Sequence, residues 1–234
     1  MTPLRVIDSG LADACANVAM SGALAELHQA GRIGDTLRLH RYPRSVLLGL
    51  HSPEEAVDRA ACARLGAQVV RRVSGGGAIA MEPGILAWDL LVTRPPNRAP
   101  EDLSRDLCEA IAAALAGCGV EAAFRAPGDI VAREGKLGGT AGLFEGMTML
   151  HQGSLLIDAD PGVMAQLLGM ADLPVTTLAR IAAEPPEAGR VAGVIARAIA
   201  AALGRDPVQG DLSTEEIAMA RRMAGKEMPW PAAC

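Results

Sequence analysis

The order of the predicted elements indicates an α+β fold, in which mixed, mostly antiparallel sheets are flanked by helices. Strand-like segments come in adjacent groups, with helix-like segments between the groups instead of after every strand. Half of the 234 residues are hydrophobic, which is enough to build a sizeable core. No internal repeat or low-complexity linker divides the sequence. We therefore expect a single domain over residues 1–234.

Two helices are predicted before the first glycine-rich segment. Residues 11–30 place apolar side chains at helical spacing and are rich in alanine and leucine, and the glycine that follows would end this helix. Residues 52–66 form the second, with Ser52 as its N-cap, Pro53 at the first helical position and Gly66 at its end.

Strands are predicted on both sides of the second helix. Residues 36–50 alternate apolar and polar side chains and then become leucine-rich after a proline, which predicts two strands around a turn. Residues 69–73 and 85–92 are strand-like runs joined by a glycine-rich connection. Pro95 and Pro96 would then end the pairing, because proline lacks the N–H that a ladder requires.

The second half of the chain is expected to contain a helix, short strands and a helical tail. Residues 101–117 carry acidic residues early and a long apolar stripe, which is typical of an amphipathic helix. Short strands are suggested at residues 129–132, 146–150 and 153–158. The tail after Pro174 is largely helical in pattern, notably at residues 191–203 and 214–225.

Charge and composition exclude several kinds of partner. The net charge of -5 and the sequence pI near 5.4 argue against a broad nucleic-acid-binding face, which needs clustered cations. The N-terminal residues lack the basic start and apolar run of a signal peptide. No segment reaches the roughly 20 apolar residues of a membrane span. We therefore expect a soluble, cytoplasmic protein with no nucleic-acid or membrane partner.

The cysteines point to a reducing compartment. Their number is odd and no two have the CxxC spacing, which disfavours both a disulfide framework and a zinc site. The five are Cys15, Cys62, Cys108, Cys118 and Cys234.

The first segment that indicates chemistry is the run from Arg71 to Ala78, which reads RRVSGGGA. Three consecutive glycines let backbone N–H groups converge on an anion, and the adjacent guanidiniums can add charge-assisted hydrogen bonds. This pattern suits a phosphate or an adenylate. A flexible turn between two strands would have the same glycine content, and the run matches neither GxGxxG nor GxxxxGK[ST].

The second such segment is the run from Asp129 to Ala141, in which Lys136 lies between glycines near the end of a predicted strand. A lysine in this position can reach a phosphoryl or carboxylate oxygen and stabilise negative charge that develops there. Taken alone, a lysine such as Lys136 is more often a solvated residue of a turn.

The two segments, in this order, resemble the signature of the lipoate-protein ligase family, which has an RRxSGGGA loop, then ND, then GKxxGxA, then a His-Gly segment. The matching positions here are Arg71 to Ala78, Asp129, Gly135 to Ala141, and His151 to Ser154. The resemblance covers the whole chain as a catalytic domain. It implies the biotin/lipoate ligase catalytic-domain fold and an enzyme that activates lipoate with ATP to lipoyl-AMP, then transfers the lipoyl group to a lysine of an acceptor protein.

The resemblance also implies roles for individual residues. Lys136 should be catalytic, because attack on ATP and attack on the mixed anhydride both load negative charge near it. Asp129 is expected to align Mg²⁺ or the incoming lysine amine. The residues expected to bind ATP or lipoyl-adenylate are Arg71, Arg72, Ser74, Gly75, Gly76, Gly77, Ala78, Ile79, Ala80, Asp129, Lys136, Gly139, Thr140, Ala141, His151 and Gly153. The implied substrates and cofactors are ATP, Mg²⁺ and lipoate.

The sequence departs from the family pattern at several positions. After the glycine loop, the His and Asn of the common HDxGN segment are replaced by Met81 and Ile85, while Glu82 keeps the acid. Gly128 stands where an Asn usually precedes the aspartate. The many Leu, Met and Val residues fit a narrow apolar tunnel for the acyl chain, and they equally fit an ordinary core.

Three alternative functions stay open at this point. An octanoyl or lipoyl transferase of the same fold would need a cysteine nucleophile, and Cys118 is better explained as a helix-terminal core thiol. A biotin-protein ligase would usually show GRGRxxR, which this sequence lacks. A non-catalytic acyl-binding relative would have kept the fold and lost the activity.

The resemblance further implies protein partners. A lipoyl-acceptor protein is expected to present the lysine to be modified. The residues after Pro185 are too few for the accessory domain that many such ligases carry, so a separate accessory subunit is a further expected partner. The remaining histidines, His28, His40 and His51, are interpreted as structural or exposed.

Overall fold

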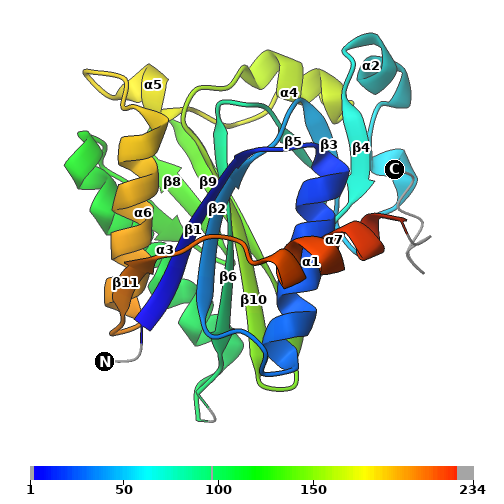
Figure 1. Ribbon diagram of the computed structural model, residues 1–234. Coiled ribbons are helices and arrows are strands. Elements are labelled where there is room, and N and C mark those ends of the chain that lie inside the picture. Colours follow the sequence, from blue (N-terminus) through cyan, green and yellow to red (C-terminus); the bar gives the residue numbers. More distant parts are fainter. Residues whose placement is uncertain (1–2, 96, 226–234) are drawn as a thin grey trace.

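Two sheets form the framework of the protein (Figure 1), whose computed structural model describes residues 3–95 and 97–225. The larger sheet contains β1 (Pro3–Leu11), β2 (Thr36–Arg41), β6 (Ile85–Thr93), β7 (Ala123–Arg125), β8 (Asp129–Ala132), β9 (Gly135–Glu145), β10 (Thr148–Leu156) and β11 (Asp206–Gln209). The smaller sheet contains β3 (Ser45–Leu48), β4 (Gln68–Arg71) and β5 (Ile79–Met81).

The strand pairing is mixed and mostly antiparallel. The order in the larger sheet is β11-β1-β2-β6-β10-β9-β8-β7, and β1 is parallel to both of its neighbours while the other adjacent pairs are antiparallel. In the smaller sheet, β3 is parallel to β4 and antiparallel to β5. The predicted α+β class with mixed, mostly antiparallel sheets is therefore confirmed.

Helices cover both faces of the larger sheet. They are α1 (Ala14–Gln29), α2 (Arg59–Arg64), α3 (Pro100–Ala114), α4 (Pro161–Leu167), α5 (Leu178–Ile181), α6 (Ala188–Ala202) and α7 (Thr214–Gly225), with short 3-10 helices η1 (Glu54–Ala56) and η2 (Leu115–Cys118). Helices α3 and α6 pack on one face, whereas α1, α7 and the smaller sheet lie on the other (Figure 1). No helix in the described part of the chain is long and apolar enough to cross a membrane.

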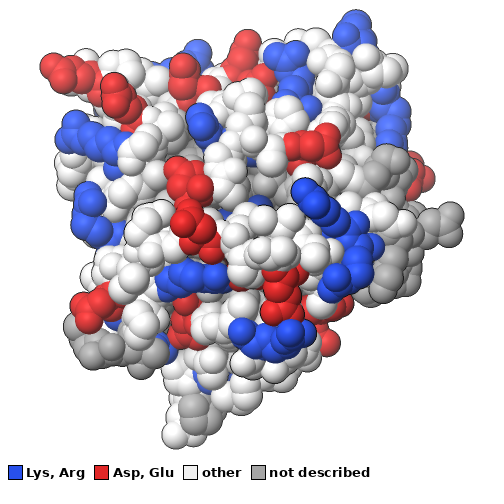
Figure 2. Space-filling view, viewed as in Figure 1, with Lys and Arg blue, Asp and Glu red and all other residues white. Residues whose placement is uncertain are grey.

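The alternation of side chains along β6 decides which residues can reach a site between the sheets. Leu86, Trp88 and Leu90 belong to the core beneath α3 and α6. Because successive side chains of a strand point to opposite faces, Ala87 and Asp89 face the smaller sheet instead. Basic and acidic side chains are interspersed on the face of the molecule shown in Figure 2.

The predicted helix over residues 11–30 is confirmed apart from its first turn. Leu11 ends β1, and Asp13 is the N-cap of α1, because its Oδ1 accepts hydrogen bonds from the backbone N–H groups of Cys15 and Ala16. The helices predicted near residues 101–117, 191–203 and 214–225 are present as α3 with η2, α6 and α7.

The predicted start of the helix over residues 52–66 is wrong. The N-cap of α2 is Asp58, whose carboxylate accepts the backbone N–H of Ala61 at 2.8 Å. The Ser52 hydroxyl instead donates to the carbonyl of Gly76 at 2.9 Å, so it holds the glycine-rich segment. Gly66 does follow the end of the helix, with a left-handed φ of 65°.

Several strands were not predicted. The outer strands β1, β7 and β11 have no clear alternation, and the glycine-rich connections contain β5 and most of β9. The two short strands predicted at residues 146–150 and 153–158 form one strand, β10, which pairs without interruption with β6 from Thr148 to Leu156. Strand β6 ends at Thr93 before Pro95, whereas Pro96 and Cys234 lie outside the described residues.

Candidate active site

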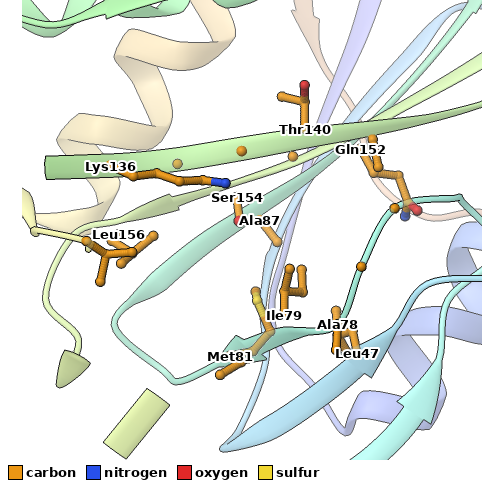
Figure 3. A pocket seen from close by; sticks show the side chains of 18 of the residues that line it. Leu47, Ala78, Ile79, Met81, Ala87, Lys136, Thr140, Gln152, Ser154 and Leu156 are labelled. Carbon is orange, nitrogen blue, oxygen red and sulfur yellow. The ribbon is translucent and has the colours of Figure 1, made fainter. Parts of the chain in front are cut away.

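A cavity of about 470 Å³ lies between the larger sheet, the smaller sheet and the segment around α4. Figure 3 shows side chains that converge on it from β3, β5, β6, β9 and β10. The site residues predicted from the sequence that line it are Arg72, Gly76, Gly77, Ala78, Ile79, Ala80, Asp129, Lys136, Gly139, Thr140, Ala141 and Gly153. The fold therefore brings the two sequence segments, more than fifty positions apart, to opposite walls of one cavity.

Lys136 is the second residue of β9 and is held by its backbone on two sides. It pairs with Val131 of β8, its N–H donates to the carbonyl of Pro174, and its carbonyl accepts the N–H of Thr176. Its ammonium group, 36 % exposed as a side chain, lies beside Gly139, where a Cβ would be 3.0 Å from Nζ. A glycine at position 139 therefore leaves the room that the ammonium needs inside the cavity (Figure 3).

Asp129 joins Lys136 to a second cation at the mouth of the cavity. Its Oδ1 lies 2.6 Å from Lys136 Nζ and its Oδ2 accepts a hydrogen bond of 2.8 Å from Arg125. Burial acts to raise the pKa of Asp129, but the hydrogen bonds and charges of Lys136 and Arg125 outweigh it and leave the pKa below its usual value. Asp129 is thus ionised at neutral pH. Arg125 was not predicted as a site residue.

Arg72 places a third cation on the opposite wall. Its guanidinium donates to Ser74 Oγ at 3.2 Å, to the Leu47 carbonyl at 3.0 Å and to the Gly75 carbonyl at 2.5 Å. Burial lowers the pKa of Arg72 to about 10, so the group stays charged at neutral pH. Gly76, with φ at 87°, makes room for it, because a Cβ there would lie 2.9 Å from Nη2.

Four predicted site residues do not line the cavity, namely Arg71, Ser74, Gly75 and His151. Ser74 and Gly75 act on the site through Arg72, as acceptors of its hydrogen bonds. Arg71 turns away and donates to the carbonyls of Gly49, Leu50 and Ser52. It therefore fixes the loop that follows β3.

His151 lies on the face of β10 that turns away from the cavity. It stacks on Trp88, whose indole N–H donates to His151 Nδ1 at 3.4 Å. Burial lowers the pKa of His151 to about 4, so the imidazole is neutral at pH 7. The neighbouring Gln152 points to the opposite face and lines the cavity. Strand alternation places His151 and Gln152 on opposite faces of β10, and the tertiary fold determines which face meets the cavity.

Polar residues that were not among the predicted site residues line the inner part of the cavity: His40, Tyr42, Asp89 and Gln152. Asp89 is completely buried and ion-paired with Arg38, whose Nη2 lies 2.6 Å from Asp89 Oδ2. This end of the cavity is therefore polar. Leu156, Met164 and Leu173 line another part of the same cavity.

The structure explains the retained acid and one of the departures from the family pattern. Glu82 does not line the cavity; its carboxylate accepts hydrogen bonds from Arg44 Nε and from the backbone N–H of Asp160, just before α4. Gly128 packs against Thr140, because a Cβ there would lie 2.6 Å from Thr140 Oγ1.

Comparison with known proteins identifies the family. Residues 13–200 match the model described as the lipoyl protein ligase A/B catalytic domain. The chain belongs to the lipoyl protein ligase A/B family. It is thus an enzyme of the group that contains lipoate ligases and octanoyltransferases.

Relatives of this chain are named either as octanoyltransferases or as lipoate-protein ligases. It is 24% identical to octanoyltransferase LipM of Kyrpidia tusciae, over 97% of this chain and 96% of that protein. It is 28% identical to lipoate-protein ligase A subunit 1 of Thermoplasma acidophilum, over 67% of this chain and 64% of that protein.

Solved structures show the same fold. A putative lipoate protein ligase from T. acidophilum with bound lipoic acid superimposes with a TM-score of 0.84 at 22% identity, over 97% of each chain. A biotin protein ligase from Aquifex aeolicus gives a TM-score of 0.53 at 13% identity, over 87% of this chain and 70% of that chain. The biotin/lipoate ligase catalytic-domain fold that the sequence predicted is confirmed.

Proposed function

We propose that this protein is an ATP-dependent acyl-protein ligase that activates lipoate, or a related acid of similar length, and transfers it to a lysine of an acceptor protein. The observation that carries the proposal is the position of Lys136. Its ammonium lies within a cavity large enough for an acyl-adenylate, opposite the glycine-rich segment that carries Arg72. Cations placed in this way stabilise charge on a carboxylate and on a phosphate.

In the first step, a carboxylate oxygen of the acid attacks the α-phosphorus of ATP, and pyrophosphate leaves. Lys136 would hold the carboxylate and a non-bridging α-phosphate oxygen together, which replaces a bimolecular encounter by a positioned reaction. In the second step, the neutral amine of the acceptor lysine attacks the carbonyl carbon of the mixed anhydride and AMP leaves with the bonding electron pair. The amine loses a proton to the solvent, and Asp129, at the mouth of the cavity, is placed to orient that amine.

An octanoyltransferase is the second candidate, and the similarity to LipM favours it. Such a mechanism needs a reactive thiol at the acyl carbonyl. No cysteine in the described part of the chain lines the cavity, and Cys62, Cys108 and Cys118 are buried. Cys108 lies 3.6 Å from Thr140 Oγ1, but burial raises the pKa of its thiol, which opposes thiolate formation. The geometry therefore supports the ligase better.

The residues at the mouth of the cavity do not fit a magnesium ion bound by protein ligands alone. Both oxygens of Asp129 are paired with cations, and the described residues contain no group of three or more His, Cys, Asp or Glu side chains that could hold a metal. The tentative assignment of Asp129 to Mg²⁺ therefore has no part in these steps.

Two partners belong to the proposal. A lipoyl-acceptor protein would supply the lysine. A structurally similar protein from T. acidophilum is described as a bi-partite lipoate protein ligase with its E2 lipoyl domain, at a TM-score of 0.83 and 21% identity. By analogy, we propose that a separate accessory subunit can act with this chain.

Replacing Lys136 by Ala tests the assignment of the catalytic residue. We expect acyl-adenylate formation, measured as pyrophosphate release with lipoate and octanoate, to fall by about 100-fold to 1000-fold, because the charge that stabilises the transition state is lost. Arg133→Ala is the matched control, since Arg133 lies in the adjoining turn with its side chain 94% exposed. A Lys136→Ala protein with the wild-type rate and a native circular dichroism spectrum would exclude the proposed role.

A further inference from the structure

One end of the cavity is lined by hydrogen-bonding side chains, and we call it the polar end: His40, Tyr42, Asp89 and Gln152. Its position relative to Lys136 follows from the strand register. The Lys136 ammonium lies at the level of Gly139, which pairs with Ser154, and Gln152 lies two residues further along β10. The polar end therefore begins about 7 Å along the sheet from the ammonium, at roughly 3.3 Å per residue.

The ionised groups at the polar end already have partners. Asp89 Oδ2 accepts hydrogen bonds from Arg38 Nε at 2.9 Å and from Ser21 Oγ at 2.9 Å, in addition to its contact with Arg38 Nη2. Arg38 also donates to Asn17. The charge of Asp89 is thus neutralised by Arg38, on the side away from the cavity. What the polar end offers to a ligand is its neutral groups.

Gln152 presents a hydrogen-bond acceptor that has no partner. Its Nε2 donates to Asp89 Oδ1 at 2.6 Å, and a carboxylate can only accept, so the orientation of the amide is fixed. The remaining atom, Gln152 Oε1, is buried and without a hydrogen bond. Figure 3 shows this side chain extending from β10 toward the segment that carries Ala78, across the cavity.

His40 presents a donor that makes no well-formed hydrogen bond. Its Nε2 lies 3.4 Å from Arg38 Nη2 and 3.3 Å from Tyr42 Oη. A guanidinium can only donate, so we assign the acceptor role to Nε2 and the imidazole proton to Nδ1. His40 Nδ1 is buried without a hydrogen bond, and the side chain is 1 % exposed. Buried polar atoms nearly always have a hydrogen-bond partner in a functional protein.

We propose that the polar end binds a neutral group that both donates and accepts hydrogen bonds, at the end of the acyl chain remote from the carboxylate. A hydroxyl, an amide or a ureido group has this chemistry. The methyl end of octanoate has neither a donor nor an acceptor, and a ring sulfur like that of lipoate is only a weak acceptor. The inference rests on the proposed function, of which it specifies the substrate class.

The direct test compares acids of one chain length in the wild-type protein. Isothermal titration calorimetry would measure the binding of 8-hydroxyoctanoate, suberic acid monoamide, octanoate and lipoate, with and without α,β-methylene-ATP. We expect the hydroxy acid or the monoamide to bind at least about tenfold more tightly than octanoate and lipoate, because only they satisfy both free atoms. Equal or tighter binding of octanoate or lipoate, or no binding of any acid, would overturn the proposal.

A variant of Gln152 tests which residue is responsible. Gln152→Met removes the acceptor at similar volume and should reduce the preference for the monoamide over octanoate to about threefold or less. Gln166→Met, on the exposed side of α4, is the matched control and should keep the full preference. A Gln152→Met protein that folds and keeps that preference would contradict the proposal. Pyrophosphate release is assayed separately, so preferential binding without adenylate formation would refute the ligase and leave this inference standing.

Discussion

Glycines at three positions leave space for a larger neighbour in or beside the cavity. Gly139 and Gly76 do so for the cations Lys136 and Arg72. Gly153 does so for Trp88, its direct partner in the pairing of β10 with β6. Some glycines in the site are therefore required because a neighbouring side chain packs directly against the backbone, as well as because a ligand needs access to it.

Gly153→Ala should destabilise the fold. A Cβ at this position would lie 2.0 Å from Trp88 Cζ2, so the indole and the strand must move apart, which costs about 1–3 kcal/mol of unfolding free energy. Gly189→Ala is the matched control, because no atom lies within 4 Å of a Cβ there and alanine favours helix α6. Urea denaturation of both variants decides the matter, and equal stability would rule out the packing argument.

At the scale of elements, a buried polar network joins α1, β2, β6 and β10 behind the cavity. Asp89 of β6 is bound by Arg38 of β2, Ser21 of α1 and Gln152 of β10. The network links the helix and three central strands, so it fixes the wall on which the polar end of the cavity is built.

Asp89→Asn should therefore lower the free energy of unfolding by about 3–5 kcal/mol, because it leaves the buried charge of Arg38 uncompensated. Glu54→Gln makes the same chemical change in the exposed Glu54–Arg59 pair and should cost about 1 kcal/mol or less. Thermal and urea unfolding would compare the two. A similar loss of unfolding free energy in both variants would show that the buried charge of Arg38 does not need Asp89 for compensation.

The elements differ in how far the sequence predicted them. The amphipathic helices α3 and α6 were predicted because their apolar stripes follow the helical period and pack on one face of the sheet. Strand β9 was missed because five of its eleven residues, from Gly135 to Glu145, are Gly or Ala, so no alternation is visible. Helix α2 was predicted too early because Pro53 can begin a helix, whereas the chain uses the carboxylate of Asp58.

The candidate site was predicted in part. The linked motifs selected Lys136, Asp129 and the glycine-rich segment, which the fold brings to one cavity. They did not select His40 or Asp89, because these residues belong to no motif and reach the cavity only through the register of β2 with β6, where Leu39 pairs with Trp88. Contacts between distant strands of this kind are set by the tertiary fold and leave no local pattern.

At the scale of the whole molecule, the chain combines a fold shared by ligases and octanoyltransferases with a cavity that carries cations and, among the described residues, no thiol. An adenylate mechanism uses the cations, whereas a thioester mechanism requires the thiol. The acyl donor therefore distinguishes the two activities: a ligase uses a free acid with ATP, and an octanoyltransferase uses an acyl thioester.

The most direct test is the intact mass of a lipoyl-acceptor domain after incubation with this protein, a candidate acid, ATP and Mg²⁺. The acids are lipoate, octanoate and 8-hydroxyoctanoate, and parallel reactions omit ATP or use Lys136→Ala. We predict a gain of one acyl group that requires ATP and is lost in the variant. Acyl transfer from an octanoyl thioester donor without ATP, together with no ATP-dependent gain from any of the acids, would contradict the ligase assignment.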